Sequence, residues 1–220
     1  FAALWAKAQA LAQAGAPEDA QAAYQAALLK APGSHTQGYR MDAHLDAALD
    51  ALGRADPARA SACVRRAEDA LRAALGGDWE RRNRLRAYRG VALMANRDFA
   101  GASKCFLAGL ATHQATELLP YDRLVFYAVV TSAVALPRAR LRAEVGEAPE
   151  VLAALPRLAA LGPFLACLRD GDYAGFARAF ADVADAVRAD ALLAPHHRYF
   201  VREVRRVAYA QYLASYRAVA

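Results

Sequence analysis

The chain shows a helical periodicity of apolar residues that glycine, proline and capping residues interrupt at intervals. No stretch alternates with a period of two around a hairpin turn, so β-strands are not expected. Gly15 ends the first predicted helix and Pro17 begins the second, because proline fits the first turn of a helix. Four prolines break residues 137–170 into short helices. The longer helices of this all-α chain are expected near residues 2–14, 17–31, 34–53, 57–76, 78–96, 98–112, 122–136, 172–189 and from 195 to at least 217.

The first two predicted helices follow the 34-residue tetratricopeptide pattern. Ala8 and Ala20 are small enough to let the paired helices approach closely, and Tyr24 fills the space beyond them. The strings that begin at Asp98 and Asp172 are similar to each other, which indicates further, degenerate repeats. We therefore predict an α-solenoid of antiparallel helix pairs, about six in number. The positions that carry these repeats are Trp5, Ala8, Leu11, Ala20, Tyr24 and Ala27, then Gly90, Leu93, Ala102, Phe106 and Gly109.

The composition agrees with a helical protein that buries a substantial core. Alanine, leucine and arginine dominate, isoleucine is absent, and 57% of the 220 residues are hydrophobic. These three residue types favour helices because they lose little side-chain freedom there. The composition excludes a disordered chain or a disulfide scaffold, and no apolar run approaches the roughly 18 residues of a membrane span. The chain begins at Phe1 without a methionine, so we expect it to be a fragment of a longer protein.

The cysteines indicate the redox state of the compartment, and the charges indicate the kind of partner. Cys63, Cys105 and Cys167 form no CxxC pair, which argues against zinc and favours a reducing compartment such as cytosol or nucleus. Residues 78–142 carry eleven basic and five acidic groups, which accounts for the whole net charge of +6. Such a stretch indicates an acidic partner, although the excess of arginine over lysine is also typical of a GC-rich genome.

Residues suited to catalysis or to metal binding do not converge in the sequence. No serine lies in a nucleophile elbow, and no phosphate-binding loop or zinc-binding helix motif is present. His196 and His197 are adjacent, so on a helix they point about 100° apart and cannot chelate together. Asp42, Asp46 and Asp50 share one helix face and could bind a divalent ion, but a solvated acidic face is the simpler interpretation. We predict no enzyme activity, no metal and no cofactor.

The sharpest charged feature is an arginine cluster at residues 81, 82, 84, 86 and 89. Guanidinium groups bind carboxylates in bidentate pairs, so the cluster could dock acidic side chains of a partner. Alternatively, it forms a solvated face paired with Asp78 and Glu80. Binding of nucleic acid is disfavoured, because only Trp79 and Tyr88 interleave aromatic rings with this charge.

The last predicted helix combines aromatic and basic residues. Phe200, Val204 and Val207 follow helical spacing and predict a core stripe. The remaining tyrosines and arginines are of the types that protein interfaces favour. Stacking on RNA is a less favoured alternative. The aromatic and basic residues are Arg198, Tyr199, Arg202, Arg205, Arg206, Tyr209, Tyr212 and Tyr216.

Two long strings resemble one known family. The string from Asp78 to Gly90, DWERRNRLRAYRG, is similar to a block in the PCI-domain, non-ATPase subunits of the proteasome regulatory-particle lid, in the family of subunit seven in yeast numbering. The string from Ala194 to Glu203, APHHRYFVRE, is similar to the long helix of that family. The resemblance is clear over about residues 78–217, whereas residues 1–77 agree only as a tetratricopeptide-like pattern.

The resemblance implies a non-catalytic scaffold in the lid of the 26S proteasome, in cytoplasm and nucleus. It implies partners among other lid and regulatory-particle subunits in a hetero-oligomer, without nucleic acid or membrane. Residues 1–77 would form N-terminal helical repeats, and residues 78–220 would lead into the helical part of a PCI module whose winged helix is missing here. The candidate partner interface comprises Asp78, Trp79, Arg81, Arg82, Arg84, His196, Arg198, Tyr199 and Arg202.

Two alternatives remain open at the level of sequence. The related PCI subunit one of the COP9 signalosome has the same architecture, but the strings Arg81–Arg84 and Tyr199–Glu203 favour the proteasome family. A stand-alone tetratricopeptide adaptor that binds an acidic peptide would explain the basic middle of the chain. It would not explain the aromatic and basic final helix.

Overall fold

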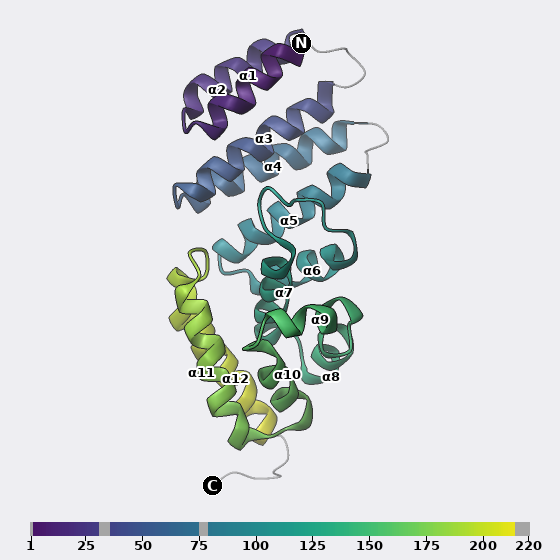
Figure 1. Ribbon diagram of the computed structural model, residues 1–220, viewed down its shortest axis with the longest axis vertical. Helices are drawn as coiled ribbons and strands as arrows, with labels where there is room; N and C mark the ends of the chain where they lie inside the picture. The colour runs from purple at the N-terminus through teal and green to yellow at the C-terminus, as the bar shows by residue number, and fades with distance from the viewer. Residues whose placement is uncertain (1, 31–35, 75–78, 214–220) are drawn as a thin grey trace. The chain divides into compact units, whose positions relative to one another are not determined.

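The computed structural model describes residues 2–30, 36–74 and 79–213 (Figure 1). The described residues form helices joined by short turns and contain no β-strand, which confirms the all-α prediction. The first seven helices are α1 Ala2–Gln13, α2 Pro17–Leu28, α3 Thr36–Gly53, α4 Pro57–Ala73, α5 Trp79–Ala95, α6 Phe99–Gly109 and α7 Tyr121–Ala135. The next five are α8 Arg138–Leu141, α9 Pro149–Ala154, α10 Leu161–Asp170, α11 Tyr173–Ala189 and α12 His197–Leu213.

The helix boundaries differ from the predicted ones at a few ends. The 3-10 turn Ala194–His196 contains Pro195, so α12 begins two residues after the proline that was expected to open it. Helix α7 begins one residue before Asp122, with Pro120 as its N-cap. Helix α4 ends at Ala73, earlier than predicted. The caps predicted at Ser34 and Asp78 and the stop at residues 76–77 lie outside the described residues.

One turn geometry recurs between consecutive helices. A residue with positive φ ends the helix, and the next residue donates its backbone N–H to the carbonyl five positions earlier, which satisfies a carbonyl that the helix end leaves open. Asp56 donates to Ala51 and Asp98 donates to Leu93, both at 2.9 Å. The four residues with positive φ in these turns are Gly15, Ala55, Arg97 and Gly171.

Aspartates cap the helices that follow three of these turns. Asp98 accepts a hydrogen bond from the backbone N–H of Gly101 at 2.8 Å, and Asp172 accepts one from Gly175 at 2.9 Å. A Cβ atom at Gly101 or Gly175 would lie within 2.5 Å of the capping carboxylate. Glycine therefore permits the close cap, and the similarity between the two strings reflects a shared helix start.

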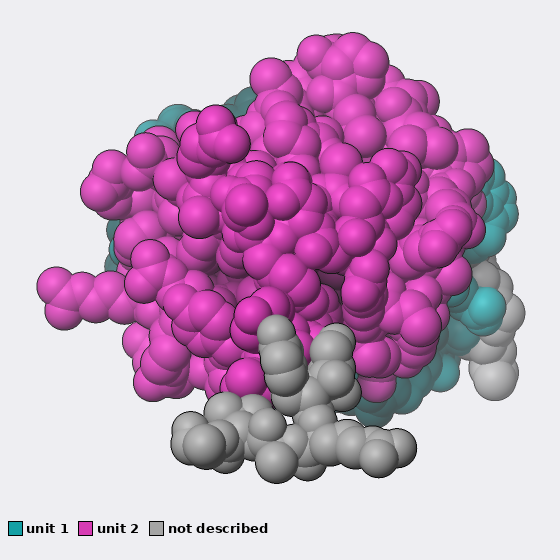
Figure 2. Space-filling view, turned by 90° about the horizontal axis from the view of Figure 1, so that it is seen from below, with its two compact units in different colours: residues 1–92, 113–118 teal, residues 93–112, 119–220 magenta. Residues whose placement is uncertain are grey.

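The described residues divide into two compact units, coloured separately in Figure 2. Unit 1 comprises residues 1–92 and 113–118, and unit 2 comprises residues 93–112 and 119–220. The boundary follows residue 92, whereas the sequence suggested a change at residue 77. The short segment 113–118 belongs to unit 1 although it follows α6 in the chain.

Unit 1 consists of helix pairs with an alanine-rich core. Helix α1 packs on α2, α3 packs on α4, and α2 contacts α3, so neighbouring pairs bury faces against each other as in a solenoid. Ala8 and Ala20 are buried where α1 meets α2. The ring of Tyr24 lies 4.8 Å from that of Trp5 and fills the space beyond them. The predicted close packing of the first repeat is confirmed.

Unit 2 has a core that is richer in aromatic rings. Helix α6 packs on α7, whose residues 124–133 are all buried, and α11 packs on both α10 and α12. The rings of Phe176 and Phe180 stack at 5.4 Å, and Phe180 lies 5.9 Å from Phe200 of α12. The predicted core stripe of the last helix is confirmed at Phe200 and Val204, while Val207 is half-buried. Among the described residues, no helix is long and apolar enough to cross a membrane.

Candidate functional site

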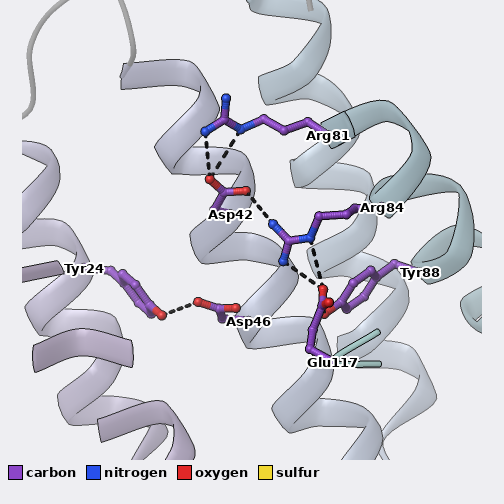
Figure 3. Close-up of polar contacts among 7 residues, drawn as sticks. All are labelled: Tyr24, Asp42, Asp46, Arg81, Arg84, Tyr88 and Glu117. Carbon is purple, nitrogen blue, oxygen red and sulfur yellow. Dashed lines mark hydrogen bonds and ion pairs between the residues drawn. The ribbon is translucent and has the colours of Figure 1, made fainter. Parts of the chain in front are cut away.

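An ion-pair network in unit 1 joins α3, α5 and the segment 113–118 (Figure 3). Arg81 and Arg84 of α5 both reach Asp42 of α3, each with a guanidinium nitrogen 3.1 Å from a carboxylate oxygen. Arg84 also contacts Glu117 at 2.8 Å. The hydroxyl group of Tyr88 donates to the same Glu117 oxygen at 3.2 Å. The network thus ties three separate stretches of unit 1 together.

Helical spacing places these side chains. Arg81, Arg84 and Tyr88 are three and four residues apart, so they share one face of α5. Tyr88 is fully buried, whereas the Arg84 side chain keeps 22% of its exposure. Burial alone would lower the pKa of Arg84, but the carboxylates of Glu117 and Asp42 outweigh it and raise the pKa. The guanidinium group is therefore held as a cation within its own unit.

A second contact extends the network toward α2. The hydroxyl group of Tyr24 donates a hydrogen bond to Asp46, one helical turn after Asp42 on α3. Burial raises the pKa of Asp46, and the hydrogen bond from Tyr24 offsets part of that rise. Burial and the neighbouring carboxylate raise the pKa of Tyr24 as well. The raised pKa keeps the Tyr24 hydroxyl group protonated, so that it can donate to Asp46.

The three aspartates that share one face of α3 each have a partner within the chain. Asp42 pairs with two arginines, Asp46 accepts from Tyr24, and Asp50 lies 2.9 Å from Arg54. Among the described residues, no group of three or more histidine, cysteine, aspartate or glutamate side chains could hold a metal ion. The aspartates are not the solvated face that the sequence suggested either, because their side chains face partners and are mostly buried.

The arginine cluster splits into two sets. Arg81 and Arg84 serve the ion-pair network, and their part in the candidate partner interface stays a prediction. Among the described residues, Arg81 and Arg84 both pair with Asp42, and Arg84 also pairs with Glu117. Arg82, Arg86 and Arg89 are exposed, as is Trp79, which keeps 63% of its surface. Asp78, which the candidate interface included, lies outside the described residues.

The candidate residues near the start of α12 also divide. His196 is buried, and its Nδ1 accepts a hydrogen bond from Nε of Arg97 at 3.1 Å. Burial first, and then the charge of Arg97, lower the pKa of His196. His196 therefore belongs to the packing of unit 2, and its part in the candidate partner interface stays a prediction.

The other predicted contacts on α12 are more accessible. The ring of Tyr199 stacks on Phe99 at 5.5 Å and is half-buried. Arg202 is 70% exposed and lies over the Tyr199 ring at 5.4 Å, next to Glu203 at 3.0 Å. Arg198 is exposed. Arg198 and Arg202 thus remain available for a partner, whereas Tyr199 mainly supports the helix.

A buried carboxylate in unit 2 was not singled out by the sequence. The side chain of Asp190, at the end of α11, is 1% exposed and accepts from the Tyr127 hydroxyl group at 3.0 and 3.1 Å. Arg123 lies 3.0 Å from it. The backbone N–H groups of Leu192 and Leu193 donate to it at 2.9 and 3.0 Å. These donors satisfy the buried charge and fix the turn that leads to α12.

Comparison with known proteins adds the family. The sequence model of a protein family described as 26S proteasome subunit RPN7 matches residues 2–144. The chain belongs to this family. The match includes the Asp78–Gly90 string and also covers the N-terminal helices, where the sequence alone indicated only a repeat pattern. The similarity noted at residues 194–217 lies beyond the matched range and stays a prediction.

Curated relatives carry the same family name or its equivalent. The chain is 44% identical over 144 residues to "26S proteasome non-ATPase regulatory subunit 6" of Oryza sativa subsp. japonica and 47% identical over 148 residues to "26S proteasome regulatory subunit rpn7" of Schizosaccharomyces pombe. It is 38% identical over 148 residues to "26S proteasome regulatory subunit RPN7" of Saccharomyces cerevisiae. These alignments cover 66% of this chain and 37%, 37% and 34% of the relatives. The chain thus spans little more than a third of the relatives that it matches.

Proposed function

We propose that this chain is the helical-repeat part of a non-catalytic scaffold subunit in the lid of the 26S proteasome regulatory particle. The observation that carries the proposal is the match of residues 2–144 to the RPN7 family. Through this role the protein would support lid assembly and hence ubiquitin-dependent protein degradation.

The structure of unit 1 supports a binding role over a chemical one. The charged groups that converge there neutralise each other in the ion-pair network and tie helices together. The arginines on the opposite side of α5 remain exposed. A helical-repeat protein offers such exposed faces to neighbouring subunits, because each repeat uses its other faces for stacking.

We further propose the setting that the resemblance implies. The partners would be other lid and regulatory-particle subunits in a hetero-oligomer, in cytoplasm and nucleus. The domain organisation would consist of N-terminal repeats over residues 1–77, followed by helices of residues 78–220 that lead into a PCI module. Arg82, Arg198 and Arg202, together with Trp79, are the predicted contacts that the structure leaves exposed.

Affinity purification of the full-length protein from its host tests this proposal. We expect proteasome lid and ATPase subunits to be recovered in stoichiometric amounts, and native gels to show the tagged protein in assembled 26S particles. Recovery of signalosome subunits alone would contradict the proposal and favour the related PCI subunit. Recovery of the protein as a free monomer would favour a stand-alone adaptor.

A further inference from the structure

A groove of about 230 Å³ runs between α4 and α5 on the surface of unit 1. Leu71 of α4 and Leu85 of α5 line it, and both pack on the core of the unit. The groove therefore has an apolar floor that is continuous with the core. Four arginines border this floor, namely Arg72, Arg82, Arg86 and Arg89.

The described residues balance the charge of this groove only in part. Arg72 pairs with Asp69, outside the lining, at 3.2 Å. Glu68 is the one carboxylate among the lining residues, and it is shared between Arg72 at 3.5 Å and Arg89 at 3.3 Å. Within the described ranges, neither Arg82 nor Arg86 has a carboxylate within 4.0 Å. Arg86 instead donates to the side-chain carbonyl of Asn83 at 2.9 Å. The lining therefore carries three more positive than negative charges.

The spacing of the arginines sets the size of a matching ligand. Arg82, Arg86 and Arg89 follow each other at four and three residues, so they form one stripe along two turns of α5. Seven residues of helix span about 10 Å. Trp79 precedes Arg82 by three residues, on the same side of the helix, and is 63% exposed. Exposed tryptophan and arginine are the residue types that most often carry binding energy at protein interfaces.

We propose that this groove binds an acidic segment of a partner protein. The segment would be about two helical turns long, with one apolar side chain on the floor formed by Leu71 and Leu85. Its carboxylates would pair with Arg82 and Arg86, the arginines of the groove that have no acidic partner among the described residues. The inference deepens the proposed function by naming the chemistry of one subunit contact, and it rests on that function only for the source of the segment.

The groove suits a protein segment better than a nucleic acid. Glu68 lies within the groove and repels a phosphate backbone, whereas a peptide with an apolar residue can cover it. The floor is aliphatic, so bases would have to stack on Trp79 at the end of the arginine stripe and not within the groove. An acidic amphipathic helix suits both the apolar floor and the arginine stripe. Its apolar and its acidic residues can each recur every three or four positions, as the arginines do.

The test uses the full-length protein and two labelled probes. One is a synthetic helical peptide with a central leucine flanked by glutamates at three- and four-residue spacing, and the other is a single-stranded oligonucleotide. Fluorescence anisotropy gives the dissociation constants at low and at physiological salt. Arg82→Glu/Arg86→Glu reverses the two unpaired charges, and Arg178→Glu/Arg205→Glu is the control, with two exposed arginines of unit 2. Circular dichroism verifies that both variants keep their helix content.

We expect the groove variant to weaken binding of the acidic peptide by about tenfold or more, which corresponds to about 1.4 kcal/mol, while the control changes it less than about twofold. Binding should also weaken with salt, as contacts between charged groups do. Equal peptide binding by wild type and groove variant would overturn the proposal, as would an oligonucleotide that binds more tightly than the peptide and depends on the same arginines. Purification of the wild type with proteasome subunits tests the proposed function separately, so either idea can fail alone.

Discussion

In each of the two units arginine pairs with a carboxylate, but the surroundings of that carboxylate differ. In unit 1 the Asp42 side chain keeps 16% of its exposure, and its partners are the guanidinium groups of two arginines. In unit 2 the Asp190 side chain is 1% exposed and accepts from two backbone N–H groups as well as from Tyr127 and Arg123. A half-buried carboxylate can link side chains across helices, whereas a fully buried one must also be fixed by the backbone.

The same comparison explains which arginines of α5 form ion pairs within unit 1 and which remain exposed. Arg81 and Arg84 face carboxylates of their own unit and hold its helices together. Arg82 and Arg86, on another side of the same helix, meet no carboxylate among the described residues and remain exposed. Both sets consist of arginines on the same helix. The position of a carboxylate elsewhere in the chain therefore decides which arginine stabilises the fold.

The largest effect is expected where burial is most complete. Asp190→Ala removes five hydrogen-bond or ion-pair contacts and leaves Tyr127 and two backbone N–H groups without their acceptor. We expect the free energy of unfolding to fall by about 3 kcal/mol. Urea denaturation followed by circular dichroism measures it. The control is Asp185→Ala, which removes an exposed pair with Arg188 and should cost less than about 0.5 kcal/mol.

The corresponding change in unit 1 should cost less. Asp42→Ala removes one carboxylate from both Arg81 and Arg84, and Arg84 keeps Glu117, but water can reach both guanidinium groups. We expect a loss of about 2 kcal/mol in the same denaturation experiment. A loss equal to that of Asp190→Ala would show that burial does not separate the two networks. A loss below about 0.5 kcal/mol would show that the network contributes little to stability.

The buried side chain of His196 gives a third comparison, through the pH dependence of the free energy of unfolding. The unfolded chain protonates His196 near pH 6.5, whereas the folded state resists protonation because its pKa is lowered. The folded state thus binds fewer protons than the unfolded state below that pH. As the pH decreases, the free energy of unfolding therefore falls by up to about 1.4 kcal/mol per pH unit. His196→Gln should remove this share of the pH dependence between about pH 7.5 and about pH 5.5. His197→Gln serves as the control, and an unchanged slope in His196→Gln would contradict the expectation.

The smallest expected change in the free energy of unfolding involves no charged group, and it gives a reference for the other changes. Ala55 has a φ of 56°, in the left-handed region where a Cβ atom is strained. Ala55→Gly should raise the free energy of unfolding by about 1 kcal/mol, as measured by urea denaturation. Ala26→Gly, at an exposed position within α2, should lower it by about 0.5 to 1 kcal/mol. The same sign for both changes would refute the strain at Ala55.

Local signals made most of the helices predictable. Asp56, Asp98 and Asp172 were recognised as helix starts because a cap bonds to the backbone only three residues away. The spacing of Ala8, Ala20 and Tyr24 predicted the first repeat because both its helices are short and adjacent in sequence. Such features depend on near neighbours, which the sequence displays directly.

The networks were not predictable because their partners are distant in sequence. Asp42 lies 39 residues from Arg81, and Tyr127 lies 63 residues from Asp190. One signal was available for Asp190, since an aspartate just after a helix and two residues before apolar Leu192 is typical of a turn that its side chain caps. For Glu117 the sequence offered none, because only the fold brings segment 113–118 back to unit 1.

The division of the arginines on α5 has one direct test, a comparison of Arg84→Ala with Arg82→Ala by urea denaturation. The account predicts that Arg84→Ala lowers the free energy of unfolding by about 2 kcal/mol, since Glu117 and Asp42 lose a partner. It predicts that Arg82→Ala changes this free energy by less than about 0.5 kcal/mol. Equal losses in the two variants, or a larger loss in Arg82→Ala, would contradict it.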